Sequence, residues 1–257
     1  MALISQERYA HGQHETLQVT PTLPLKGAVR NAANALSKGE PLLIFDNPAR
    51  EGETDIVFLA EKVTAEKVRF MRREAGGLLC VTVPEELMTA IGLGFQQDML
   101  GELSTAHPIL SKLVPSNLPY DRRSAFGLAV NHRSTFTGVS DRDRALTIRA
   151  VGEIVRDSAF MGKRELEQRF ANEFIVPGHV PLLHAARGLL AERRGHTELS
   201  TALAKVAGLT QSLALMEMLS DDGGSLPVKE AIERAQRRGW AFVDGEEIQQ
   251  SWFQWFG

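Results

Sequence analysis

The sequence contains a single cysteine, Cys80, among its 257 residues. One thiol cannot form an intrachain disulfide, and it cannot build a cysteine-based zinc site. Cys80 lies in the apolar segment 78–83, where a buried structural thiol is the default expectation. Disulfide frameworks and cysteine-zinc frameworks are therefore excluded as the basis of the fold.

Long apolar runs and an excess of basic residues are also missing. No run approaches the roughly eighteen apolar residues of a membrane span, and residues 1–12 show no basic segment followed by an apolar core. The 29 lysines and arginines are outnumbered by 32 acidic residues, which argues against a general nucleic-acid binder. We therefore expect a cytoplasmic protein with no membrane partner and no nucleic-acid partner.

Three common nucleotide and hydrolase motifs are absent as well. The sequence has no glycine-rich loop of the nucleotide-hydrolase kind, no dinucleotide fingerprint and no serine in a nucleophile-elbow context. What it has is an alternation of apolar strand-like segments with helix-like segments, which indicates a layered α/β domain with some α+β character. The predicted strands are 42–45, 56–60, 78–83, 125–131, 180–185, 212–219 and 240–243, and the predicted helices are 25–36, 64–75, 84–91, 142–156, 163–174, 197–207, 227–238 and a tail through 256.

The alternation of strand-like and helix-like segments begins only after residue 23, and this indicates the domain organisation. Residues 1–23 are polar and aperiodic and predict a loosely ordered extension, whereas 24–257 contain no linker and predict one catalytic domain. Residues 92–123 are broken by glycines and prolines, which is typical of an irregular excursion that forms a lid or an interface. Asp141 is expected to cap the helix that follows it.

An acidic loop, residues 50–55, follows the first predicted strand. If the chain stays extended there, Glu51, Glu53 and Asp55 lie on the same side. Three adjacent carboxylates repel one another unless a hard cation neutralises them or one of them holds a proton. A metal site or a general acid/base site would result, and the alternative is a solvated acidic turn.

A basic segment, Arg193 to Thr197, stands where a loop opens a helix. The free N–H groups and the positive dipole end of a helix favour an anion, and Gly195 would let it approach. Arg193 and Arg194 add charge and paired donors, so the segment predicts a phosphate site. The alternative is an exposed basic loop in which Thr197 acts only as an N-cap and His196 is a surface imidazole.

Two isolated polar residues are further candidates. His179 follows Pro177 and Gly178, which predict a turn that lifts the imidazole clear of regular structure. Glu217 lies inside the apolar segment 213–219, so its carboxylate either faces solvent or is buried and needs a partner. The pattern slightly favours the solvent-facing version, whereas a buried Glu217 would be a candidate acid or base.

Taken together, six segments resemble one family in their order and spacing: REGETD at 50–55, the Cys80 strand, TGVSDRDRALTI at 137–148, PGHVPLL at 177–183, RRGHTE at 193–198 and LALMEML at 213–219. That family is 3,4-dihydroxy-2-butanone 4-phosphate synthase. The resemblance implies a single domain with a mixed sheet between helical layers, and a homodimer with active sites at the subunit interface.

The resemblance also implies an activity in riboflavin biosynthesis. A lyase of this kind converts D-ribulose 5-phosphate into L-3,4-dihydroxy-2-butanone 4-phosphate and formate with Mg²⁺ or Mn²⁺. The expected course is a metal-stabilised enediolate, acid/base-assisted dehydration, a carbon shift and deformylation. Two alternatives are a magnesium-dependent sugar-phosphate isomerase and a non-catalytic module that binds a phosphorylated metabolite.

The resemblance also implies roles for individual residues. Glu51 and His196 match the metal ligands. The catalytic positions are His179, Glu217, Asp55 and Glu53, and the substrate-binding positions are Arg50, Asp55, Arg193, Arg194, Gly195, His196, Thr197, Glu217, Cys80 and Thr137. The chain departs from the family at Thr54, where glycine is usual, and at Phe136, where many members have threonine.

Overall fold

The computed structural model describes residues 25–114, 118 and 121–256, so the expected extension 1–23 lies outside the described residues. Its strands are β1 Leu42–Phe45, β2 Thr54–Leu59, β3 Cys80–Val83, β4 Phe126–His132, β5 Phe174–His184, β6 Leu213–Glu217 and β7 Ala241–Asp244. They form one sheet in the order β4-β5-β3-β6-β2-β1-β7. The pairs β1 with β7 and β3 with β5 are parallel and the other pairs are antiparallel. The expected mixed sheet is confirmed.

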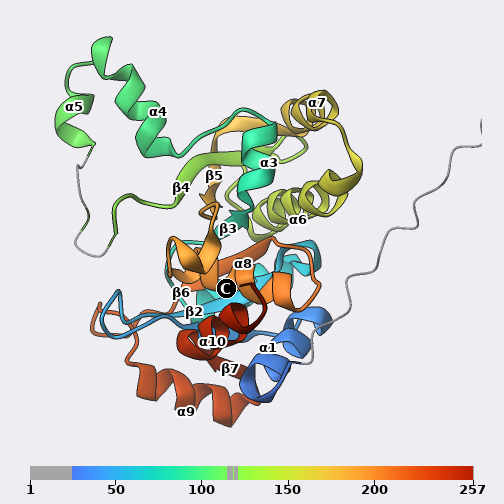
Figure 1. Ribbon diagram of the computed structural model, residues 1–257, viewed down its shortest axis with the longest axis vertical. Coiled ribbons are helices and arrows are strands. Elements are labelled where there is room, and N and C mark those ends of the chain that lie inside the picture. The colour runs from blue at the N-terminus through green and yellow to red at the C-terminus, as the bar shows by residue number, and fades with distance from the viewer. Residues whose placement is uncertain (1–24, 115–117, 119–120, 257) are drawn as a thin grey trace, which may run out of the picture.

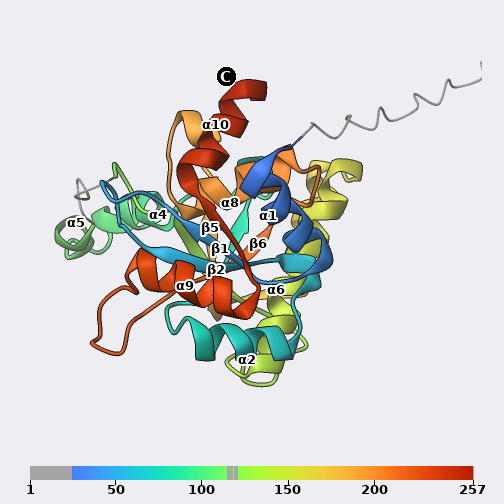
Figure 2. The ribbon, with the colours of Figure 1, turned by 90° about the horizontal axis from the view of Figure 1, so that it is seen from below.

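Helices cover both faces of this sheet (Figures 1 and 2). One face carries α1 Gly27–Lys38, α8 His196–Val206 and α10 Gly245–Phe256. The other carries α2 Ala65–Glu74, α3 Glu85–Ala90, α6 Asp141–Asp157, α7 Lys163–Glu173 and α9 Val228–Arg238. Along β2, Ile56 and Phe58 pack under α2 and α6, whereas Val57 and Leu59 pack under α1 and α8. This period of two gives each layer its own apolar core.

The excursion 92–123 is partly helical. It contains α4 Gln96–Glu102 and α5 Leu110–Leu113, and Figure 1 shows both of them away from the helices that cover the sheet. Neither of these two helices has a buried residue. Within the described ranges, no helix is long and apolar enough to cross a membrane.

Two helices end at glycine, and one expected helix cap is wrong. Gly39 and Gly239 end α1 and α9 in the left-handed conformation, with φ of 70° and 68°. The expected cap of α6 at Asp141 is wrong, because Ser140 is the N-cap and its Oγ accepts from the Asp143 N–H at 3.1 Å. Asp141 instead pairs with Arg72 on α2 at 3.1 Å, which fastens α6 to α2.

Residues 177–179, where a turn was expected, lie within strand β5 but at an irregularity of the sheet. The pairing with β4 passes from Val130 opposite Val180 directly to Asn131 opposite Ile175, so residues 176–179 fall in a register shift. Gly178 is needed for close contact and not for a turn, because a Cβ there would lie 1.9 Å from the carbonyl carbon of Val130. Its effect is therefore to bring two strand backbones together.

Candidate active site

A cavity of about 120 Å³, here called the carboxylate cavity, opens where the acidic loop, β6 and the start of α8 meet. All three carboxylates of the acidic loop reach it. Its lining consists of Glu51, Glu53, Asp55, Cys80, Leu118, Ser124, Ala125, Phe126, Leu183, Arg193, His196, Thr197, Leu215 and Glu217. The acidic loop is therefore part of a concave polar site and is not an isolated solvated turn.

Asp55 is the most deeply placed of these carboxylates. It is 1% exposed, stands opposite Glu217 in the β2–β6 ladder, and its Oδ1 has no hydrogen-bond partner within the described part of the chain. Burial raises the pKa of Asp55, and the charges of Glu217, Glu53 and Glu51 raise it further against the opposing effect of His196. A carboxyl group whose pKa is raised toward neutrality can both give and take a proton.

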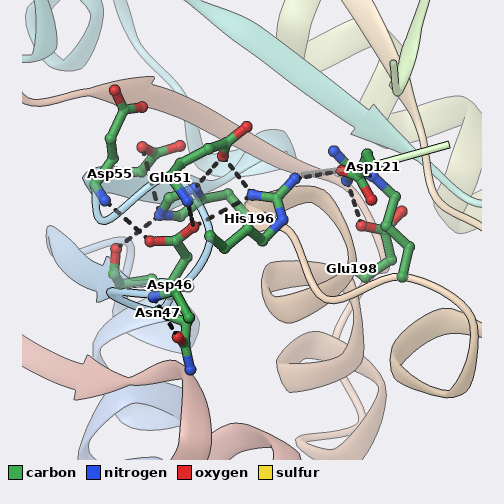
Figure 3. A network of polar contacts seen from close by, with 12 residues as sticks. Asp46, Asn47, Glu51, Asp55, Asp121, His196 and Glu198 are labelled. Carbon is green, nitrogen blue, oxygen red and sulfur yellow. Dashed lines mark hydrogen bonds and ion pairs between the residues drawn. The ribbon is translucent and has the colours of Figure 1, made fainter. Parts of the chain in front are cut away.

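His196, the first residue of α8, lies between two carboxylates (Figure 3). Its Nε2 is 3.6 Å from Asp55 Oδ1 and 3.2 Å from the carbonyl oxygen of Ile44, and its Nδ1 is 3.8 Å from Glu51 Oε2. Burial alone would lower the pKa of His196, but Asp55 and Glu51 outweigh it and raise the pKa. For Glu51, burial alone would raise the pKa, but the hydrogen bonds and charges of His196 and Arg50 outweigh it and lower the pKa to about 2.

Asp46 shapes the acidic loop and was missed at the sequence level. Its carboxylate accepts from the Glu53 N–H at 2.9 Å, the Glu51 N–H at 3.2 Å and Arg50 Nη1 at 3.3 Å. The available signal was an aspartate directly after a strand in Asp-Asn-Pro, a setting in which the side chain often binds nearby backbone N–H groups. Ligand atoms of Asp46, Glu51 and His196 all lie within 4.8 Å of one another, a spacing suited to one cation.

Glu217 ends β6 and is half-buried. Its Oε2 accepts from the Leu78 N–H at 2.7 Å, and Gly77 makes room for it, since a Cβ at 77 would lie 2.3 Å from that oxygen. Glu217 therefore lies between the two expectations, because its carboxylate is partly exposed, has a backbone partner and also lines the cavity. The nearby Cys80 is buried, and burial together with Glu217 and Asp55 raises the pKa of its thiol, which keeps it protonated.

The basic segment meets the acidic loop at Gly195, the N-cap of α8. A Cβ at Gly195 would lie 2.5 Å from Arg193 Nη1 and 2.8 Å from Arg50 Nη2, so glycine lets both guanidinium groups cover the start of the helix. The buried carboxylate of Glu198 holds Arg193 Nη1 at 2.5 Å and also accepts from the Ala186 N–H. These donors and the helix N-terminus suit an anion.

A second cavity of about 410 Å³ adjoins the first, and both are lined by Ser124 and Arg193. We call it the outer cavity. Asp121 lies on its wall and accepts from both Arg50 and Arg193 (Figure 3). Neither Asp121 nor Glu198 was found from the sequence, because their partners depend on how distant segments pack.

Five predicted site residues do not line the carboxylate cavity. Arg50 and Gly195 lie next to each other beside it, since a Cβ at Gly195 would meet Arg50 Nη2, whereas the other three point elsewhere. Arg194 turns toward α10, where its guanidinium lies 5.7 Å from the Phe253 ring centroid. Thr137 is exposed beside Asp143. His179 is exposed on β5, its N–H donating to Asn131 Oδ1 at 2.8 Å.

Comparison with known proteins identifies the family. Residues 30–251 match the family described as 3,4-dihydroxy-2-butanone 4-phosphate synthase. The chain belongs to this family. The synthase of Methanothermobacter thermautotrophicus is 42% identical over 227 residues, which cover 88% of this chain and 96% of the relative. That of Archaeoglobus fulgidus is 46% identical over 216 residues, covering 83% and 89%.

A solved structure shows the same fold. The crystal structure of a 3,4-dihydroxy-2-butanone 4-phosphate synthase in complex with two magnesium ions matches with a TM-score of 0.67 at 27% identity. The match covers 87% of this chain and 95% of that one. The mixed sheet between helical layers is therefore an architecture that this chain shares with the synthase family.

Proposed function

We propose that the chain converts D-ribulose 5-phosphate into L-3,4-dihydroxy-2-butanone 4-phosphate and formate, as a step in riboflavin biosynthesis. The observation that carries this proposal is the arrangement of Glu51, Asp55, His196 and Glu217 around one cavity that Arg193 also lines. A ketose phosphate needs an anion site, a hard cation for its oxygens and groups that move protons. The site offers candidates for all three.

Glu51 and His196 are the proposed ligands of Mg²⁺, with Asp46 close enough to join them. Their fit rests on the donor set, oxygens with one imidazole, and on the buried Asp55 Oδ1, which has no hydrogen bond among the described residues and lies 3.6 Å from His196 Nε2. When bound, Mg²⁺ would polarise the carbonyl and hydroxyl oxygens of the substrate. His196 must be neutral to act as a ligand, so binding would release a proton.

The remaining side chains would bind the phosphate and transfer protons. Arg193 and the N-terminus of α8 would bind the phosphate, and Arg50 would line the same end of the site. Asp55, with its raised pKa and its place deep in the cavity, would take the proton from C3 and so form the enediol. Glu53 and Glu217 would supply and remove protons during dehydration, the carbon shift and the loss of formate.

His179 requires a second subunit in this proposal, because it lies outside the cavity of its own chain. The surface around it is apolar and exposed. Ile175 and Val176 are 40% and 55% exposed and line a groove of about 360 Å³ next to the edge strand β4. We therefore propose a homodimer in which His179, and Thr137 near it in the β4–α6 connection, complete the site of the other subunit.

Two inactive variants test this arrangement. His179→Ala and Glu217→Ala should each lose formate release, and mixing them after unfolding and refolding together should restore about a quarter of wild-type activity, since half of the dimers are mixed and one of their two sites is intact. A mixture that stays inactive while mixed dimers form would show that both residues act within one chain.

The activity itself is tested by formate release from D-ribulose 5-phosphate with Mg²⁺, beside a sample with excess chelator. Formate and a four-carbon phosphate that appear only with metal would support the synthase. An aldose phosphate without formate would favour the isomerase, and binding without turnover would favour the binding module. Asp55→Asn should abolish formate while leaving inorganic phosphate binding intact, which separates proton transfer from anion recognition.

A further inference from the structure

The carboxylate of Asp121 occupies a position between the two arginines that the proposed function assigns to the anion end of the site. Its Oδ2 accepts from Arg50 Nη2 at 2.6 Å and from Arg193 Nε at 2.9 Å (Figure 3). The Asp121 side chain is 15% exposed. One oxygen that receives donors from two guanidinium groups is also how a phosphate oxygen would be held.

Both arginines have other carboxylates to orient them. Arg50 Nη1 pairs with Glu51 and, at 3.3 Å, with Asp46. Arg193 Nη1 pairs with Glu198 at 2.5 Å, and the Glu198 side chain is fully buried. Because each guanidinium is already fixed through Nη1, Asp121 is not required to position it and instead takes up a second donor of each.

We propose that Asp121 is an internal competitor for the anion site, so that it sets the affinity for dianions such as phosphate. The inference rests on the proposed function, because it concerns the same arginines. A phosphate dianion that approaches Gly195 must replace the carboxylate at Arg50 Nη2 and Arg193 Nε. A dianion with three free oxygens can compensate for the two lost ion pairs, whereas a carboxylate monoanion such as formate replaces them with no gain in charge.

The expected effect follows from competition. If Asp121 occupies the arginines about 90% of the time, Asp121→Asn should tighten inorganic phosphate binding about tenfold, because the observed Kd scales inversely with the fraction of open sites. Sulfate should gain by the same factor, since displacement is common to both anions. The KM for D-ribulose 5-phosphate should fall while kcat changes little.

Titration calorimetry with inorganic phosphate and then sulfate, at fixed ionic strength and without metal, measures these affinities. Glu192→Gln is the matched control, because Glu192 lines the same outer cavity and carries the same charge but accepts from the Gly188 N–H. It should leave the Kd unchanged within a factor of two. In the Arg193→Lys background, Asp121→Asn should no longer tighten phosphate binding. This result would locate the effect at the guanidinium of Arg193.

Each outcome has a definite meaning. Weaker or unchanged phosphate binding in Asp121→Asn would overturn the proposal and make Asp121 a positioning residue. An equal gain in Glu192→Gln would also overturn it, in favour of a general charge effect. If Asp121→Asn is unstable, Asp121→Ser replaces it in the same titration. Formate release by the wild type is scored separately, so the proposed function can fail while the comparison of phosphate affinities still tests Asp121.

Discussion

A buried histidine outside the site gives a sharp prediction about acid stability. His184 on β5 is 3% exposed, its ring centroid lies 5.0 Å from that of Phe95, and its Nε2 has no hydrogen-bond partner among the described residues. Gly127 leaves the space for it, since a Cβ there would lie 2.4 Å from Nε2. Burial lowers the pKa of His184 to about 4, with Arg123 acting in the same direction and Asp98 against it.

Protonation of His184 makes the folded state less stable as the pH falls, because the unfolded state binds the proton first. An unfolded histidine has a pKa of about 6.5, so as the pH falls the unfolded chain takes up the proton before folded His184 does. The free energy of unfolding should be unaffected by this group above pH 7, fall between about pH 6.5 and 4, and level off below. Between pH 7.5 and 5 the loss amounts to about 2 kcal/mol.

Urea unfolding at a series of pH values, on the wild type and on His184→Leu, measures this loss. The difference in unfolding free energy between the two proteins should change by about 2 kcal/mol between pH 7.5 and 5, because groups common to both cancel. His107→Leu removes an exposed imidazole and should retain the wild-type pH dependence. A constant difference between wild type and His184→Leu across that range would refute the assignment of a neutral, buried imidazole.

Two further predictions concern the carboxylate cavity. Gly77→Ala should push Glu217 off the Leu78 N–H, because its Cβ would lie 2.8 Å from both the Cβ and the carbonyl oxygen of Glu217. Since Glu217 is a proposed acid/base group, its displacement should slow formate release at least about tenfold in initial-rate assays. Glu51→Gln should weaken Mg²⁺ binding by about 100-fold in a metal titration and lower turnover accordingly, and normal metal affinity in this variant would remove Glu51 from the ligand set.

Local patterns in the sequence were sufficient for most of the fold. The apolar runs 42–45 and 212–219 became β1 and β6, and the predicted helices 25–36 and 227–238 became α1 and α9, which end at Gly39 and Gly239. These predictions succeed because periodicity and capping depend on neighbours within a few residues. They also place the acidic loop after a strand. The loop is not extended as expected, since residues 48–51 form a turn and Gly52 has a φ of 69°, so its carboxylates reach one cavity through a fold held by Asp46.

The rest of the site depends on contacts between distant segments. Asp121 is 71 residues from Arg50 and 72 residues from Arg193, and no local pattern indicates that they meet. Thr54, which stands where the family usually has glycine, is buried inside the sheet opposite Phe45. Phe136, which stands where many members have threonine, is 98% exposed.

The glycines of two sequence motifs help to fix the position of His179. Gly178 packs against the backbone of Val130, and Gly138 packs against the side chain of Asn131, where a Cβ would lie 2.1 Å from Nδ2. Asn131 in turn accepts from the His179 N–H and lies 3.1 Å from its Nδ1. The glycines of two separate motifs therefore hold one asparagine against one imidazole. Glycine in such a motif marks close approach between segments as readily as it marks a turn, so the position of His179 depends on these contacts between distant segments as well as on the residues next to it.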